Sequence, residues 1–276
     1  MLEPNSGTGG GHGVLKLSAP TAKEYWEVPV LFEDEHLLAI SKPASLLTSP
    51  DRYDPKRANL MRMLLEGVER QVPWAVERGI KYIANAHRLD FETTGILLLA
   101  KDRPTLVSLA NQFGAMKPSK TYVALAMGVP TEDAFTVDLR LSPDPRRVGL
   151  MRWTRTGKPS VTNFNVKEKF AGASLIECRP LTGRTHQIRV HLRARGHPIY
   201  GDEAYDGELL LLSQIKRGYR PKSGQGERSL TPTVALHAWK LELPHPVGGA
   251  MVQVEAPWPK DLTVALKYLR QYAPAA

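Results

Sequence analysis

Apolar positions recur along the chain with two different spacings, which predict strands and helices. Residues 94–102 read TGILLLAKD, whose unbroken apolar run is typical of a strand buried on both faces. Leu60, Leu64 and Val68 recur at every fourth position and predict a helix over residues 58–68. Both kinds of element are therefore expected in the same part of the chain.

The other predicted elements alternate unevenly. Strand patterns occur at residues 28–43, as two strands joined by a turn, and at residues 120–128, 135–141, 161–170, 174–181, 234–243 and 250–257. Helix patterns occur at residues 102–113, 185–196 and 261–272. Many short strands and few helices favour an α+β fold with a large mixed, mostly antiparallel sheet flanked by helices and loops, rather than a regular βαβ array.

Composition divides the chain into a tail and one domain. Residues 1–27 are rich in Gly, Ser, Pro and Thr and are predicted to be a flexible tail. No linker-like stretch interrupts residues 28–276, which we expect to form one catalytic domain. Residues 206–233 read as an irregular basic insertion within it. The cations of this insertion are Lys216, Arg217, Arg220, Lys222 and Arg228.

The net charge, the cysteine count and the absence of long apolar runs indicate which partners and which cellular compartment to expect. A formal net charge of +9 favours a polyanionic partner such as nucleic acid. The one cysteine, Cys178, lies in an apolar stretch and is expected to be a buried thiol, so no disulfide can form within the chain. No apolar run approaches the roughly 18 residues that span a bilayer, and the first residues lack the pattern of a secretory signal. We therefore expect a cytoplasmic protein.

Two polar stretches are candidates for chemistry. Residues 86–95, AHRLDFETTG, place Asp90 beside Arg88 at the start of the apolar strand. Taken alone, Asp90 is either a loop salt bridge or a reacting carboxylate. In the predicted helix over residues 185–196, His186, Arg189 and Arg193 share one face and form a cationic stripe.

Sequence patterns for metals and nucleotides do not occur. His186 and His191 are five residues apart, which does not place them on one helix face, and there is no HExxH or CxxC motif. Neither a GxxxxGK[ST] phosphate loop nor a GxGxxG after a strand is found. We expect no metal site and no nucleotide cofactor.

Three stretches, taken together in this order, resemble the RluA-type pseudouridine synthase family. They are HRLDFETTG, KTY and LTGRTHQIRVHLRARGHPIYGD. The resemblance covers about residues 28–258 and implies the pseudouridine synthase catalytic fold and an isomerase, an intramolecular transferase that acts on RNA without a cofactor. Only about 27 residues precede the match, so the N-terminal S4-type RNA-binding module that members often carry is not expected.

The resemblance implies a role for each matching residue. Asp90 corresponds to the essential aspartate, Tyr122 to the active-site tyrosine, and Arg189 to the arginine that pairs with the aspartate. Arg88 corresponds to the residue that enters the space left by a flipped base. The matching stretches, with the upstream match HLLAISKPASLL, supply further candidates for RNA contact, namely His87, Lys42, Arg184, His186 and Gln187.

Two positions depart from the family pattern. Thr94 stands where serine is commoner, and Ser45 stands where glycine is usual. Neither position is a reacting group, so both departures are compatible with activity.

The chemistry explains why these residue types suit the reaction. Pseudouridine forms when the N1–C1′ bond breaks, the base turns and C5 joins C1′. A carboxylate must be ionised to act there as nucleophile or base, and an adjacent guanidinium favours the ionised form. Tyr122 can stack on uracil or carry the C5 proton, and the sequence leaves both roles open. The target base must leave its stack, which costs a few kcal/mol.

Several alternatives stay open at this level. The RNA is ribosomal or transfer RNA, and a monomer is expected. Cations at residues 146, 147, 152, 155 and 158 are candidates for phosphate contact. The rival functions are a non-catalytic RNA-binding protein on the same fold and a glycosylase that would release free base.

Overall fold

The computed structural model describes residues 13–19, 24–51, 54, 57–221 and 226–275. Its strands span Val14–Ala19 (β1), Glu24–Glu33 (β2), Leu37–Lys42 (β3), Ala84–Asn85 (β4), Thr94–Ala100 (β5), Ser119–Met127 (β6), Ala134–Pro143 (β7), Met151–Trp153 (β8), Lys158–Phe170 (β9), Ala173–Pro180 (β10), Leu236–Pro244 (β11) and Met251–Glu255 (β12). Its helices span Leu60–Glu69 (α1), Pro73–Glu77 (α2), Arg103–Gly114 (α3), Gln187–Ala194 (α4), Leu212–Ile215 (α5) and Lys260–Tyr272 (α6).

All of these strands belong to one sheet. Ten of them follow the order β1-β2-β3-β5-β11-β6-β10-β9-β7-β8, while β12 pairs with β11 and β4 pairs with β5. Among the described strands, β5 and β11 form the one parallel pair. The predicted α+β fold with a mixed, mostly antiparallel sheet is confirmed.

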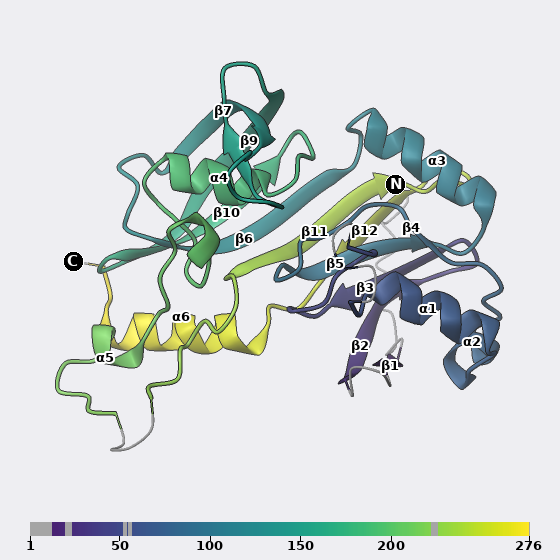
Figure 1. Cartoon of the computed structure of the whole chain (residues 1–276), viewed down its shortest axis with the longest axis horizontal. Helices are drawn as coiled ribbons and strands as arrows, with labels where there is room; N and C mark the ends of the chain where they lie inside the picture. Colours follow the sequence, from purple (N-terminus) through teal and green to yellow (C-terminus); the bar gives the residue numbers. More distant parts are fainter. Residues whose placement is uncertain (1–12, 20–23, 52–53, 55–56, 222–225, 276) are drawn as a thin grey trace, which may run out of the picture.

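The two faces of the sheet carry different helices. Val123 and Leu125 of β6 are buried under α6, whereas Ala124 and Ala126 are buried under α4. Tyr122 packs on the α4 side. Figure 1 shows α4 and α6 on opposite sides of the central strands. In the N-terminal half, α1 and α3 cover opposite faces in the same way.

The predicted flexible tail is partly wrong. Residues 14–19 form β1, which pairs antiparallel with β2 and buries Leu15 and Leu17 against α1. The stretch VLKLSA alternates apolar and polar residues, a strand pattern that the surrounding glycine-rich composition obscured. Residues 1–12 and 20–23 of the tail, and Lys222 of the basic insertion, lie outside the described residues.

Leu210, Ile215 and Leu230 of the insertion at residues 206–233 pack on the α6 side, whereas Asp206 at its start contacts Arg193 of α4. Its short helix α5 contacts α6, and Lys216 Nζ lies 4.9 Å from the centre of the Tyr272 ring. Tyr122 and Val123 are consecutive strand residues, so their side chains point to opposite faces. Because Val123 faces α6, the part of the insertion that packs on α6 and the side chain of Tyr122 lie on different sides of the sheet.

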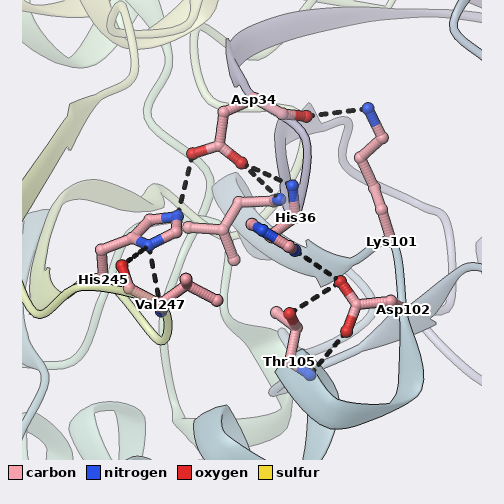
Figure 2. A network of polar contacts seen from close by, with 8 residues as sticks. Asp34, His36, Lys101, Asp102, Thr105, His245 and Val247 are labelled. Atoms are coloured by element: carbon pink, nitrogen blue, oxygen red, sulfur yellow. Dashed lines mark hydrogen bonds and ion pairs between the residues drawn. The ribbon is translucent and has the colours of Figure 1, made fainter.

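A polar network fixes the first turn of α3 (Figure 2). Asp102 caps the helix by accepting from the Thr105 amide at 2.7 Å, as its position before Arg103 predicts. It also bonds the His36 ring at 2.8 Å. His245, on the β11–β12 connection, bonds Asp34 at 3.0 Å. These contacts join three connections between strands at one end of α3.

Gly95 permits a close approach of β5 and β11. It has a φ of +106°, and a Cβ placed there would lie 2.2 Å from the carbonyl oxygen of Ala238. One residue earlier, Thr94 hydrogen-bonds the ring of His237 at 2.8 Å. The loop that carries Asp90 leads directly into β5, so this junction determines where the loop enters the sheet.

We expect Gly95→Ala to lower the free energy of unfolding by about 2–4 kcal/mol, because the added methyl group meets backbone atoms and the φ disfavours a side chain. Urea unfolding followed by circular dichroism measures this change. Gly114→Ala, at the end of α3 with open space around it, is the control and should change stability by less than about 0.5 kcal/mol. Equal stability of the two variants would contradict the proposed constraint.

Candidate active site

A cavity of about 430 Å³ opens between the C-terminal end of α3 and the start of α4. Asp90, Tyr122 and Arg189, which are far apart in the sequence, all line it. Asp90 comes from the loop before β5, Tyr122 from β6 and Arg189 from α4. The fold thus brings together the three residues that the sequence resemblance singled out as catalytic.

The loop that carries Asp90 is anchored on both sides of this residue. The Thr48 hydroxyl accepts from the Leu89 amide at 3.2 Å and donates to the Leu89 carbonyl at 2.9 Å. Lys42 Nζ donates to the Phe91 carbonyl at 3.1 Å. The backbone is therefore held immediately before and after Asp90, which leaves the carboxylate free to face the cavity.

Arg189 lies near Asp90, but its stronger partner is Asp202. Its Nη1 is 3.7 Å from Asp90 Oδ2, whereas its Nε and Nη2 donate to the two oxygens of Asp202 at 2.7 Å each. Asp202 is 1% exposed and Arg189 is 8% exposed. The predicted Arg189–Asp90 contact is present as a longer ion pair, and sequence analysis assigned no role to Asp202.

The predicted cationic stripe on one helix face is wrong. Helix α4 begins at Gln187, so His186 precedes it with a φ of +54°. Arg189 is buried against Asp202, and Arg193 donates to Asp206 at 2.6 Å. The charges of both arginines are compensated by carboxylates from the segment after α4, which residue spacing within the helix does not reveal.

His186 connects the cavity to β8 through Tyr205. Its Nδ1 is 2.7 Å from the Tyr205 hydroxyl, and its Nε2 is 3.9 Å from Asp90 Oδ1. The Tyr205 oxygen accepts from the Met151 amide at 2.8 Å. Tyr205 is 1% exposed, so its own proton needs an acceptor, and His186 Nδ1 supplies it. The His186 proton must then sit on Nε2, facing Asp90.

Burial keeps both His186 and Tyr122 uncharged. Desolvation lowers the pKa of His186 below its ordinary value, although Asp90 opposes this shift. Burial, followed by the charge of Asp90, raises the pKa of Tyr122 far above its ordinary value. The cavity therefore holds a neutral imidazole and a neutral phenol together with the Asp90 carboxylate.

Arg88 and Arg184 are exposed at the rim of the cavity. The Nε of Arg184 donates to the carbonyl of Pro159 at 3.1 Å, which ties the rim to the start of β9. Both arginines keep donors free for a ligand, so the structure is compatible with their predicted RNA contacts.

His87 and Gln187 line the cavity, and both use side-chain polar atoms to hold neighbouring backbone. His87 Nε2 accepts from the Leu98 amide, and its ring stacks on Phe113. Burial lowers the pKa of His87 to about 4. Gln187 is 4% exposed and bonds four groups of the neighbouring loop and β9. These two residues shape the wall of the cavity.

The prediction that Lys42 contacts RNA is wrong. Its side chain is fully buried, and Nζ donates to the carbonyls of Pro43, Leu46 and Phe91. Burial lowers the pKa of Lys42 to about 7. A lysine in a motif suggests a phosphate contact, but here its three donors are used by the backbone that supports Asp90.

The two departures from the family pattern fit their surroundings. Ser45 has a φ of +57°, in the left-handed region where glycine is the easiest residue to place. Thr94 uses its hydroxyl to bond His237, as a serine hydroxyl also could. Neither side chain lines the cavity.

Comparison with known proteins identifies the family. The family model described as RNA pseudouridylate synthase matches residues 36–194, more than half of the chain. The chain belongs to this family. The predicted family and its enzyme class, an isomerase, are therefore confirmed.

Relatives within the pseudouridine synthases resemble most of the chain. The ribosomal large subunit pseudouridine synthase D of Nitrosomonas europaea is 37% identical over 243 residues, which cover 87% of this chain and 65% of the relative. The ribosomal large subunit pseudouridine synthase C of Salmonella typhi is 35% identical over 251 residues, covering 88% of this chain and 70% of the relative. The chain thus spans about two thirds of these relatives.

Solved structures support the same fold. Human RNA Pseudouridylate Synthase Domain Containing 4 superposes with a TM-score of 0.64 at 23% identity, covering 87% of this chain and 92% of that chain. Human RNA Pseudouridylate Synthase Domain Containing 1 has a TM-score of 0.59 and covers 90% and 96%. No helix in the described part of this family member is long and apolar enough to cross a membrane.

Tyr205→Phe removes the hydroxyl between Met151 and His186 and keeps the ring beside Arg189. We expect the free energy of unfolding to fall by about 1–3 kcal/mol, because the Met151 amide loses its acceptor. We also expect nitrogen NMR to show the His186 proton on Nε2 in the original protein. In the variant it should show a mixture of the two neutral tautomers.

Tyr200→Phe is the matched control, since its hydroxyl makes a long hydrogen bond of 3.4 Å to the Gly172 carbonyl. It should leave the His186 signals unchanged. If Tyr205→Phe also leaves them unchanged, the Tyr205 hydroxyl does not determine the tautomer.

Proposed function

We propose that this protein isomerises uridine to pseudouridine in ribosomal RNA, with Asp90 as the reacting carboxylate. One observation carries the proposal. Asp90 is the one carboxylate among the described residues that line the cavity, and it lies there with Tyr122 and Arg189. An enzyme that needs an ionised carboxylate at C1′ of the target nucleotide has a single candidate here.

The surroundings of Asp90 suit this role. The guanidinium of Arg189 and the Nε2–H of His186 both face its oxygens, at 3.7 and 3.9 Å. At these distances neither group forms a hydrogen bond to Asp90, so both carboxylate oxygens keep acceptor positions for a ligand. Since isomerisation neither adds nor removes atoms, these residues need to orient the nucleotide and move one proton from C5.

The rim of the cavity suits a flipped base. Arg88 is exposed at the opening, and a planar guanidinium can fill the gap that the base leaves and stack on its neighbours. Lys120 and Arg184 also line the cavity and supply positive charge toward the RNA backbone. These features support RNA over a free nucleoside as the substrate.

The choice of ribosomal RNA rests on the relatives, whose names describe synthases of the large ribosomal subunit. The non-catalytic alternative gains no support, because the carboxylate, the phenol and the guanidinium are all present in one cavity. The monomeric state and the cytoplasmic location stay predictions.

Asp90→Asn tests the proposal. In RNA labelled with tritium at uracil C5, isomerisation must expel the label, whereas glycosidic hydrolysis keeps it. We expect release by the original protein on a large-subunit ribosomal RNA transcript, and a loss of at least about a thousandfold in the variant. Asp206→Asn is the control, since Asp206 is exposed and has a φ of +67° that asparagine tolerates.

Two results would contradict this assignment. No release by the original protein, with RNA binding intact, would favour an RNA-binding protein without this activity. Free uracil in the products would favour a glycosylase.

Tyr122→Phe separates the ring from the hydroxyl. The raised pKa of Tyr122 keeps the phenol protonated, so the hydroxyl can pass one proton on as it takes another from C5. We expect tritium release to fall by about a hundredfold or more, while RNA affinity changes by less than about twofold because the ring remains. A variant as fast as the original protein would leave stacking as the sole role of Tyr122.

A further inference from the structure

Trp153 is an exposed aromatic residue without an internal partner. It is 56% exposed at the end of β8, and it is the one exposed residue among the five tryptophans, all of which are described. Within the described residues its ring stacks on no other ring and lies under no cation. A large, flat, apolar side chain is thus exposed to solvent.

The strand register places Trp153 on the same face as the active site. Trp153 pairs with Leu141 of β7, and Leu141 pairs with Lys158 of β9. Directly opposed residues share a face of the sheet. Leu141 is buried against Val190 of α4 and Tyr205, so Trp153 and Lys158 flank it on the α4 side. This is also the side on which Tyr122 packs.

Two hydrogen bonds tie this region to the cavity. Met151, two residues before Trp153, donates to the Tyr205 hydroxyl, which bonds His186. Pro159, next to Lys158, accepts from Arg184 at the rim. The strands that carry Trp153 and Lys158 are therefore joined to His186 and Arg184 of the cavity, which fixes the backbone of Trp153 relative to the cavity.

The surroundings of Trp153 are positively charged. Arg146, Arg155 and Lys158 are exposed and form no ion pair in the described chain. The carboxylate of Asp144, in the same hairpin, is engaged by Arg147 at 3.3 Å. An exposed ring bordered by unpaired cations matches a nucleotide, in which a flat base is attached to charged phosphates.

We propose that Trp153 is a stacking platform for an unpaired base of the RNA beside the target uridine, with Lys158 and Arg155 contacting the flanking phosphates. The choice of RNA rests on the proposed function. A protein partner fits less well, because the exposed large apolar side chains of this hairpin are Trp153 and Val148, which stand among cations rather than in a broad apolar patch.

Fluorescence quenching by acrylamide tests the contact without relying on catalysis. Trp153 should account for most of the quenchable tryptophan emission, so Trp153→Phe should remove it. A large-subunit ribosomal RNA transcript bound to Asp90→Asn should protect this emission from quenching. Emission that stays fully quenchable in the complex would overturn the proposal.

Kinetics test what the contact contributes. Stacking of a base on an aromatic ring contributes about 1–3 kcal/mol, so Trp153→Ala should raise the KM for the RNA about fivefold or more in tritium release. Trp153→Phe should stay within about threefold of the original protein. Tyr25→Ala, which removes an aromatic ring 55% exposed on β2, should not change KM.

The charge contribution has a separate readout. Lys158→Gln should reduce the slope of log affinity against log salt by about 0.7, the value for one lost contact with single-stranded RNA. If the original protein is active and Trp153→Ala has the same KM, the stacking platform is refuted, and the proposed function is unaffected. No tritium release by the original protein would instead refute the proposed function.

Discussion

Arg189 carries a full positive charge in a part of the protein that is almost closed to water. A buried guanidinium without a partner would cost several kcal/mol, and Asp202 compensates for it with two short hydrogen bonds. The third nitrogen of the guanidinium remains directed at Asp90. The position of α4 and the course of the segment after it therefore depend on each other.

That segment also determines the second group facing Asp90. Tyr205 follows Asp202 by three residues, places its ring beside the Arg189 guanidinium and bonds the ring of His186. One short turn thus holds both the cation and the imidazole of the cavity. On the other side, Lys42 and Thr48 hold the loop of Asp90 by its backbone. Two separately anchored segments therefore surround the Asp90 carboxylate. One holds the loop of Asp90 itself, and the other holds Arg189 and His186.

The two faces of the sheet have separate roles in this arrangement. Asp90, Tyr122 and the exposed Trp153 belong to the side that carries α4, where the rim cations also lie. Leu210, Ile215 and Lys216 of the basic insertion pack with α6 on the other side. The cavity is therefore lined by residues on the α4 side of the sheet, whereas Lys216 lies against Tyr272 of α6 on the other side.

Much of the fold and the main site residues followed from the sequence. Apolar spacing predicted most strands and helices, because the period of a pattern is a local property of the chain. The order of the motifs brought Asp90, Tyr122 and Arg189 together as candidates. Strand β1 was missed because its six-residue alternation lies within a glycine-rich stretch.

The tertiary structure alone decided how those residues are held. Asp202 and Tyr205 acquired roles through contacts across the fold, and Lys42 changed from an RNA contact to a buried support because three backbone carbonyls surround it. The face of Trp153 followed from pairing across three strands. Burial and partnership depend on residues distant in the chain, and no local pattern encodes them.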